Sequence, residues 1–277
     1  MPGALSTYLF RNAVLGVHTL DQIARAGFEQ IEIYCARSHF DYTDATHVRE
    51  VAEWFADSRV RLHSLHAPLH RDLEGASPHA VVSIAFVERQ RRQDSMDEIK
   101  RALEVAERIP FRYLIAHLGV LSEEFDLRKF DAALTSLEHL RVFASPRGVE
   151  ILLENIPNEL STPARLLEFF QHTHMRDLKV CFDAGHAQLD GGVLPAIELL
   201  RGSIASTHLH DNTGAKDDHM VPGDGMIPWE KTIPALRQHA PGAALLLEVR
   251  GADGSQCLER AAKVAEQWER TSEEASS

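Results

Sequence analysis

The stretch VEILLENIPNELSTPARLLEFFQHTHMRDLKVCFD at residues 149–183 contains a complete strand–helix–strand unit. Apolar runs near 149–155 and 178–183 predict two strands. The helix-period segment between them begins with Thr162 as the N-cap and Pro163 at the first helical position. Strands that are apolar throughout are typical of parallel strands buried on both faces. The stretch therefore predicts a parallel β–α–β unit.

The same alternation continues along the rest of the chain. Further strand-like runs lie near residues 5–10, 30–35, 61–67, 112–118, 204–210 and 244–249, and helix-period segments such as 95–108 and 127–143 separate them. Eight such units predict an α/β fold, a (β/α)8 TIM barrel formed as a single domain by residues 1–270. The alternative is a doubly wound open sheet, which seldom contains eight consecutive units. The polar acidic tail at 271–277 is expected to be frayed.

Composition and charge limit the function classes. The chain has 277 residues, of which 44% are hydrophobic, and a net charge of −12, which disfavours a generally basic nucleic-acid-binding protein. The three cysteines, Cys35, Cys181 and Cys257, have no short spacing, so we expect neither a disulfide framework nor a thiolate zinc site. The sequence lacks an apolar run of about 18 residues and a signal-peptide pattern. We expect a cytoplasmic protein with a small-molecule substrate and no membrane partner.

Histidines and carboxylates gather where the predicted strands end. The chain has 16 histidines, and the strand-end residues are His66, His117, Glu154, Asp183, His186, His208, His210 and Glu248, joined by Asp217 and His219 in the loop after the seventh strand. In barrels of this kind the active site lies at the C-terminal ends of the strands. Strand alternation places Glu154 on the face of Leu152, and His208 on the face of Ser206 and Ile204. These side chains are therefore expected to point into one barrel mouth.

Converging buried carboxylates and imidazoles favour a bound cation. Without one, their mutual repulsion and loss of hydration would be costly. Imidazole and carboxylate donors without thiolate suit Zn, Mn, Co or Fe, with Mg where oxygen ligands dominate. A single strand-end histidine is more often a neutral hydrogen-bonded residue than a metal ligand. Glu154 and Glu248 are stronger ligand candidates, because a carboxylate that ends an apolar strand is rarely buried without a partner.

Four other features have simpler explanations. Asp183 in the FDAGH segment could shape an Asx turn, and Cys181 is expected to fill the barrel core. The PGDG segment at 222–225 is expected to shape a loop. The cluster of Arg89, Arg91 and Arg92 is expected in the loop region after the third strand, as a solvated face or in contact with an anionic substrate.

The order of the motifs LHAPLH, AHLG, LLENIPNE, FDAGH, HLHDN, DDHMVPGDGMIPW and LLLEV resembles the xylose-isomerase-like TIM barrel superfamily. In particular, the chain resembles its sugar phosphate isomerase/epimerase family, from about residue 20 to about residue 250. The resemblance implies that a divalent metal is held by Glu154, Asp183, His208 and Glu248. It also implies that the two glutamates act as acid and base, and that His186 contacts the substrate.

The superfamily shares its fold with endonuclease IV, which binds three zinc ions. That resemblance implies ligands at Glu154, Asp183, His208 and Glu248 and further metal ligands at His66, His117, His186, Asp217 and His219. Ketose epimerases typically carry an arginine where this chain has His219, so the chain departs from that subgroup. The FDAGH and VPGDGMIPW segments look like the isomerase-type family, and a charge of −12 disfavours contact with a phosphate backbone.

These observations favour a divalent-metal-dependent isomerase or epimerase (Mn, Zn, Co or Mg) acting on a small sugar or polyhydroxy carbonyl compound through an enediolate. One of Glu154 and Glu248 would remove a carbon-bound proton and the other would return it, while His66, His186 and His210 would hold substrate hydroxyls. The alternatives are a dehydratase on a similar substrate, a zinc phosphodiesterase acting on abasic DNA, and a metal-binding subunit without catalysis. A homodimer formed through the exterior helices is a further expectation.

Overall fold

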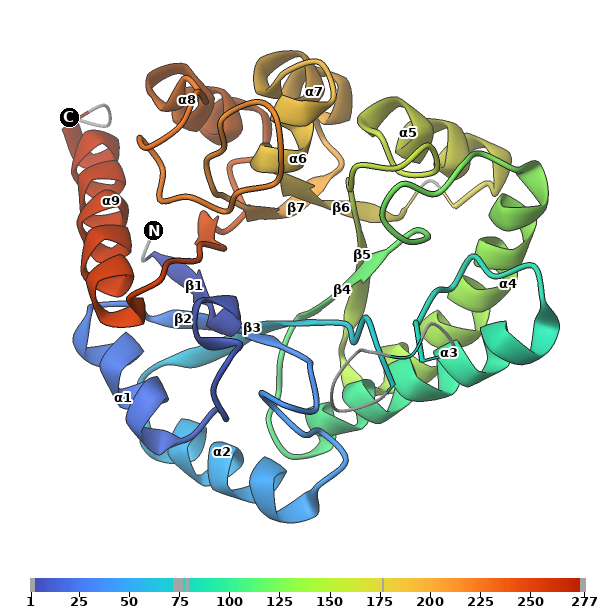
Figure 1. Ribbon diagram of the computed structural model, residues 1–277, viewed down its shortest axis with the longest axis horizontal. Helices are drawn as coiled ribbons and strands as arrows, with labels where there is room; N and C mark the ends of the chain where they lie inside the picture. The colour runs from blue at the N-terminus through green and yellow to red at the C-terminus, as the bar shows by residue number, and fades with distance from the viewer. Residues whose placement is uncertain (1–2, 72–76, 78–79, 176, 275–277) are drawn as a thin grey trace.

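A closed barrel of parallel strands lies at the centre of the computed structural model, which describes residues 3–71, 77, 80–175 and 177–274 (Figure 1). The strands are β1 (Ala4–Ser6), β2 (Gln30–Tyr34), β3 (Arg61–His66), β4 (Tyr113–His117), β5 (Glu150–Glu154), β6 (Lys179–Asp183), β7 (Ile204–His208) and β8 (Leu246–Leu247). They pair in the order β7-β6-β5-β4-β3-β2-β1-β8. Between β7 and β8, the Leu209 N–H donates to the carbonyl of Leu246 at 2.8 Å, and the Glu248 N–H donates to that of Leu209 at 3.2 Å. The predicted (β/α)8 TIM barrel is confirmed.

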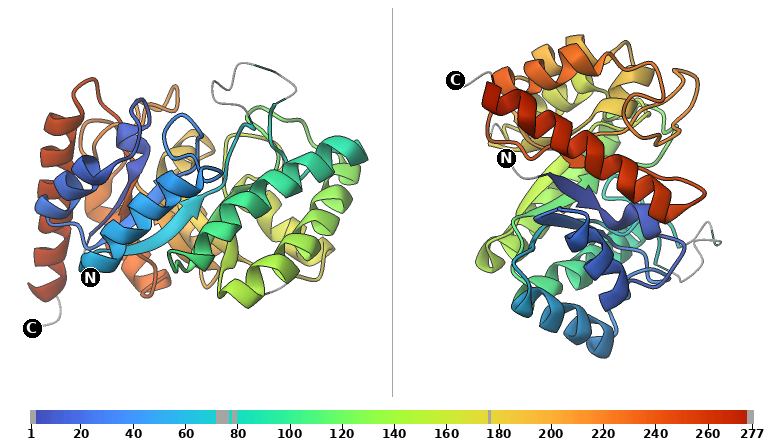
Figure 2. Two further views of the ribbon diagram at one scale, coloured as in Figure 1. Left: turned by 90° about the horizontal axis from the view of Figure 1, so that it is seen from below. Right: turned by 90° about the vertical axis from the view of Figure 1, so that its left-hand side faces the viewer.

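Helices form a ring around the strands (Figure 1). They are α1 (Val17–Arg25), α2 (Ala45–Asp57), α3 (Arg89–Leu103), α4 (Leu127–Ala144), α5 (Pro163–His172), α6 (Ala184–Leu189), α7 (Val193–Leu200), α8 (Trp229–His239) and α9 (Gly254–Glu274), with 3-10 turns η1 (Thr7–Phe10), η2 (Glu104–Glu107) and η3 (Ser145–Arg147). Figure 2 shows α9 lying across the outside of the barrel next to β1. Residues 271–274 of the expected tail belong to α9, and 275–277 lie outside the described residues. No described helix is long and apolar enough to cross a membrane.

Helix α5 begins where the sequence predicts it. The Thr162 hydroxyl accepts a hydrogen bond from the Arg165 N–H at 3.3 Å, and Pro163 occupies the first turn. A side-chain acceptor at this position satisfies one of the amides that the first turn leaves free.

The first strand is shorter than predicted. Residues expected as a strand over 5–10 divide into β1, which ends at Ser6, and the 3-10 turn η1. The Ser6 side chain accepts from the Tyr8 N–H at 3.3 Å, and this local bond competes with continued strand pairing. The turn brings Tyr8 to the barrel mouth, where it lines the cavity described below.

The arginine cluster lies on a helix and not in a loop. Helix α3 begins at Arg89, earlier than the predicted start at 95. The Arg92 guanidinium donates to the carbonyls of Phe86 and Val87 at 2.7 and 3.0 Å, and Arg91 lies 3.9 Å from the Phe86 ring centroid. These arginines hold the chain that leads into α3.

The inside of the barrel follows the predicted alternation except near the register shifts in the β2–β3 and β6–β7 pairings. Leu152 and Cys181 pack together inside the barrel, as expected for Cys181. Ser206 also faces inward, and its hydroxyl lies 3.1 Å from Nε2 of His63. Ile204, however, packs in the outer core against the helices. The pairing of β6 with β7 shifts register between Val180 and Cys181, so a strict period of two fails there.

Candidate metal centre and active site

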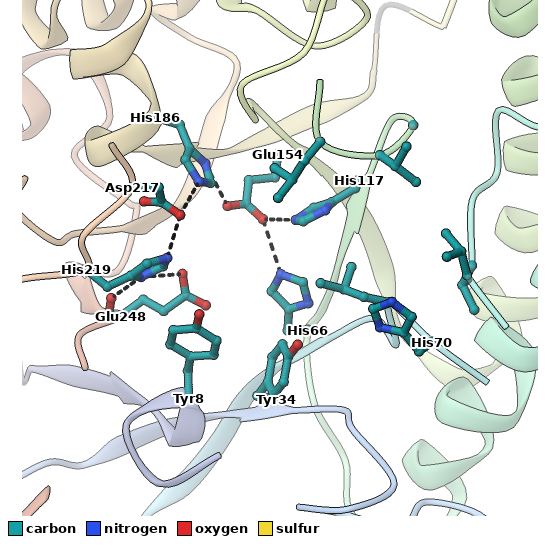
Figure 3. Close-up of a pocket in the computed structure, with 16 residues that line it drawn as sticks. Tyr8, Tyr34, His66, His70, His117, Glu154, His186, Asp217, His219 and Glu248 are labelled. Carbon is teal, nitrogen blue, oxygen red and sulfur yellow. Dashed lines mark hydrogen bonds and ion pairs between the residues drawn. The ribbon is translucent and has the colours of Figure 1, made fainter. Parts of the chain in front are cut away.

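A cavity of about 350 Å³ opens at the C-terminal ends of the strands (Figure 3). Of the predicted site residues, those that line it are His66, His117, Glu154, His186, Asp217, His219 and Glu248. Asp183, His208 and His210 have no exposed surface. Together the predicted residues form a contiguous set at the barrel mouth, as expected for residues at the C-terminal ends of the strands.

One donor group joins the ends of β5 to β8. Glu154, Asp183, His208 and Glu248 each offer one atom, and these atoms lie within 4.8 Å of one another. His208 Nδ1 lies 3.1 Å from Glu154 Oε1 and 3.6 Å from Glu248 Oε2. Buried carboxylate oxygens and one imidazole are a donor set that suits Mn, Co, Zn or Mg. The residues present therefore fit a divalent cation.

Two further donor groups flank the first. They are His66, His117 and Glu154 on one side, and His186, His210, Asp217 and His219 on the other. Glu154 belongs to two groups, because its Oε2 lies 3.0 Å from His117 Nε2 while its Oε1 faces His208. Asp217 Oδ2 lies 3.0 Å from His219 Nε2 and 3.4 Å from His186 Nε2.

Burial and neighbouring charges move the pKa values of these groups. Burial raises the pKa of Glu154, but His208 and His117 hold it well below its ordinary value. The pKa of Glu248 is raised to about 7, mainly by burial. Burial lowers the pKa of His186, but the charges of Asp183 and its other carboxylate neighbours raise it to about 10. The carboxylates thus hold protons on neighbouring imidazoles, and a cation bound here would compete with those protons.

Asp183 shapes the turn considered for the FDAGH segment, and it also belongs to the first donor group. Its Oδ1 accepts the His186 N–H at 2.6 Å and caps α6, while its Oδ2 lies 3.1 Å from Nε2 of His210. The Asn155 side chain bonds to both the N–H and the carbonyl of Asp183 at 2.8 Å. Glycine is required at 185, because a Cβ there would lie 1.9 Å from Cε1 of His210.

The three predicted substrate-contacting histidines differ in position. His66 and His186 line the cavity. His210 has no exposed surface and stacks on His219, with ring centroids 3.9 Å apart. His210 therefore contacts Asp183 and His219 but is not among the residues that line the cavity.

The loop after β7 is organised by one buried aspartate. Asp211 accepts hydrogen bonds from the N–H groups of Gly223 and Ile227 at 2.9 and 3.1 Å, and from Nε1 of Trp229 at 2.8 Å. The PGDG segment thus shapes this loop, as predicted. His219 belongs to this loop and lines the cavity, and its Nδ1 lies 2.9 Å from the Glu248 carbonyl.

Sequence reasoning missed Glu32, which lies on β2 and has no exposed surface. Its Oε2 accepts the Ser64 hydroxyl at 2.7 Å and lies 3.1 Å from His208 Nε2. Although burial raises the pKa of Glu32, His208 holds it below its ordinary value. The available signal was a carboxylate inside the apolar run QIEIYC, the same kind of signal that marked Glu154.

Two tyrosines were also missed. Tyr8 lies with its ring centroid 4.8 Å from that of His219, and Tyr34 lies 5.4 Å from His66. Both line the cavity, and Figure 3 shows Tyr8 beside Glu248 and Tyr34 beside His66. Burial, followed by the charge of Glu248, raises the pKa of Tyr8 to about 12, so its hydroxyl keeps its proton.

Comparison with known proteins agrees with this geometry. The uncharacterized protein y4fM of Sinorhizobium fredii is 26% identical over 253 residues, which cover 81% of this chain and 78% of that protein. The solved structure of a D-tagatose 3-epimerase-like protein superposes with a TM-score of 0.81 at 21% identity, covering 100% of both chains. The IOLI protein with a bound zinc atom superposes with a TM-score of 0.77 at 18% identity, covering 97% of this chain and 96% of that one. The family described as xylose isomerase-like TIM barrel matches residues 20–273, and the chain belongs to that family.

Proposed function

We propose that this protein is a divalent-metal-dependent isomerase or epimerase of a small polyhydroxy carbonyl compound. The observation that carries the proposal is the donor group of Glu154, Asp183, His208 and Glu248, whose atoms lie within 4.8 Å of one another beneath the cavity. The fold likeness to a D-tagatose 3-epimerase-like protein and to a zinc-binding barrel supports the reaction class. A divalent cation held here would supply a Lewis acid for the substrate oxygens.

The chain's own residues supply the proton transfer. Glu154, at the end of β5, and Glu248, just after β8, both reach the cavity (Figure 3). Both lie beside the same nitrogen of His208. Their exposed fractions are only 1% and 3%, so bulk water has little access to them. One carboxylate takes the proton from carbon, and the other returns it to the neighbouring carbon or the opposite face. His66 and His186 line the same cavity and can donate to substrate hydroxyls.

The test follows the carbon-bound proton. Metal-loaded protein is incubated in deuterium oxide with ketoses, inososes and keto acids, and exchange is followed by NMR. Glu154→Gln and Glu248→Gln are each expected to lower the exchange rate by about 10²- to 10⁴-fold. Glu138→Gln, on the exposed face of α4, is the matched control and should leave the rate unchanged. Full exchange in both glutamine variants with metal still bound would contradict the mechanism.

A second candidate function is hydrolysis of a phosphodiester. It is favoured by the two donor groups that flank the first one. One of them shares Glu154 with the first group, and the other adjoins it through the contact of His186 with Asp183. Neighbouring metal ions about 4 Å apart can stabilise both the attacking and the leaving oxygen.

Metal content separates the two candidates. Protein purified without chelator is analysed by plasma mass spectrometry and assayed on DNA with an abasic site. About one metal per chain, with no cleavage, supports the isomerase. Two or three zinc ions per chain and cleavage that His219→Ala abolishes would support the phosphodiesterase.

A further inference from the structure

The cavity has no arginine or lysine among its described lining residues, and His66 and His186, whose pKa values are raised, lie beside the carboxylates. Two arginines near it are engaged with other groups. The Arg11 guanidinium bonds to the Tyr8 hydroxyl, and Arg250 donates to the backbone carbonyls of Asp217 and Asp218 at 3.1 and 3.0 Å. A phosphate group carries a charge of about −1.5 to −2 and is usually held by such cations. The cavity is poorly suited to a phosphate at the end of the substrate remote from the carboxylates.

Apart from His70, the side chains that the loops after β3 and β4 supply to the cavity are apolar. We call this side of the cavity the apolar wall, and it consists of Leu69, Val81, Val82, Val120 and Leu121. Its part from the loop after β3, formed by Leu69, Val81 and Val82, is held by backbone pairing. His70 forms a β-bridge with Val81, and the Val82 N–H donates to the Leu69 carbonyl at 2.9 Å. Figure 3 shows His70 away from the group formed by Asp217, His219 and Glu248.

The second part of the wall is fixed by side-chain hydrogen bonds. The Asn158 amide donates to the carbonyls of Leu118 and Val120 at 3.1 and 2.9 Å, and Glu123 accepts from the Val120 N–H at 2.8 Å. Gly119 has a φ of +91°, which favours glycine, and a Cβ there would lie 2.7 Å from the Glu123 carboxylate. The loop therefore presents Val120 and Leu121 in a defined position.

Leu121 is 61% exposed although it lines the cavity. By contrast, the carboxylates of Glu154 and Glu248 are almost fully buried. A ligand that reaches the carboxylates with its carbonyl and hydroxyl groups would place its other end against the wall. Alkyl groups gain from that contact because both surfaces leave water. A hydroxyl placed against the leucine and valine side chains would gain less, because the contact displaces part of its water.

We infer that the substrate is an uncharged polyhydroxy carbonyl compound with an alkyl group, such as the methyl of a deoxy sugar, at the end remote from the reacting carbon. The inference rests on the proposed function, because it takes Glu154 and Glu248 as the reacting end of the site. The apolar wall selects the alkyl group, and the absence of arginine and lysine from the described lining disfavours a phosphate at that end.

The experiment compares matched triplets, each consisting of a ketohexose, its 6-deoxy counterpart and its 6-phosphate, across the available stereoisomers. Metal-loaded protein is assayed for exchange of the carbon-bound proton and for product, and kcat/KM is compared within each triplet. The 6-deoxy compound is expected to exceed the parent by about 10- to 100-fold, the range that small apolar pockets achieve. The 6-phosphate is expected to be the poorest substrate.

A variant tests whether the wall is responsible. Leu121→Asn is expected to remove most of the preference, because it should lower kcat/KM for the 6-deoxy compound more than for the parent compound. Leu127→Asn is the matched control, because Leu127 is 50% exposed but does not line the cavity. It should keep the preference. Circular dichroism establishes that both variants are folded.

The outcomes separate this inference from the proposed function. If the parent or the 6-phosphate is turned over at least as well as the 6-deoxy compound, the substrate class is wrong and the proposed reaction stands. A preference that survives Leu121→Asn would also overturn the role of the wall. If no member of any triplet exchanges its proton, the proposed function fails, and the inference fails with it.

Discussion

Replacing Glu32 by glutamine tests how the barrel interior holds the donor histidine. Glu32 Oε2 lies 3.1 Å from His208 Nε2, and its other oxygen lies at the same distance but has no hydrogen-bond partner. With Nε2–H donated to this carboxylate, Nδ1 of His208 is left to face Glu154 and Glu248. A carboxylate behind a ligand histidine fixes its tautomer and raises its basicity.

The expected loss of metal affinity follows from the contacts of Glu32. In Glu32→Gln the amide oxygen can still accept from Ser64 and His208, but the NH2 group then lies about where Oε1 was, close to a nitrogen that already carries hydrogen. A hydrogen bond to a charged group contributes about 1.5–3 kcal/mol and a neutral one about 0.5–1.5 kcal/mol, so the loss is about 1.5 kcal/mol. That loss corresponds to about tenfold in metal affinity, and losses at such positions reach about 100-fold.

The assay is titration of chelator-treated protein with Mn²⁺ or Co²⁺ by calorimetry. Glu32→Gln should weaken binding by about 10- to 100-fold. Ser64→Ala removes a second partner of Glu32 but keeps the carboxylate on His208, so it should change affinity by less than about threefold. Unchanged affinity in folded Glu32→Gln would refute the reasoning, as would an equally large loss in Ser64→Ala.

Three further predictions concern the metal-free fold. The folded-state pKa of His186, about 10, lies above its ordinary value of 6.5, so its stabilising contribution is complete below pH 6.5 and is lost as the pH rises toward 10. Chelator-treated protein should therefore melt at a lower temperature near pH 10 than near pH 6.5, and His186→Asn should reduce this difference; an identical profile in the variant would contradict the assignment. Gly185→Ala should lower the free energy of unfolding in urea by about 1–3 kcal/mol, because the new Cβ would lie 1.9 Å from the His210 ring. Gly242→Ala, where a Cβ meets nothing within 4 Å, should change it by less than about 0.5 kcal/mol, and equal effects would disprove the steric argument. Asn158→Ala should lower the free energy of unfolding, measured by calorimetric melting, by about 2 kcal/mol or more, because it leaves buried carbonyl and N–H groups without partners. An unchanged free energy of unfolding would mean that water takes the place of the Asn158 side chain.

The barrel and the position of its site were predictable from local patterns. Apolar runs that alternate with helical periods require parallel strands covered by helices, and the C-terminal ends of such strands meet at one mouth. The polar residues that end these runs, from His66 to Glu248, therefore had to come together. The structure gathers them into three groups, and within each group the donor atoms lie within 4.8 Å of one another. Their roles as ligands, acid and base stay predictions.

Glu32 shows why part of the site escaped this reasoning. It lies in the middle of β2 and not at its end, and the β2–β3 pairing shifts register between Ile31 and Glu32. Whether a mid-strand side chain meets His208 depends on that shift, which is set by packing across strands. The same holds for Ile204, whose outward position follows from the register shift between β6 and β7.

The sequence by itself determined the number and direction of the strands and which polar side chains meet at their ends, because both follow from periodicities of a few residues. Tertiary structure alone decided the partner of His208 and the wall of leucine and valine that lines the same cavity as the carboxylates. These features join segments that are distant in the chain, such as Gly119 and Asn158, and no local period records a contact between two loops.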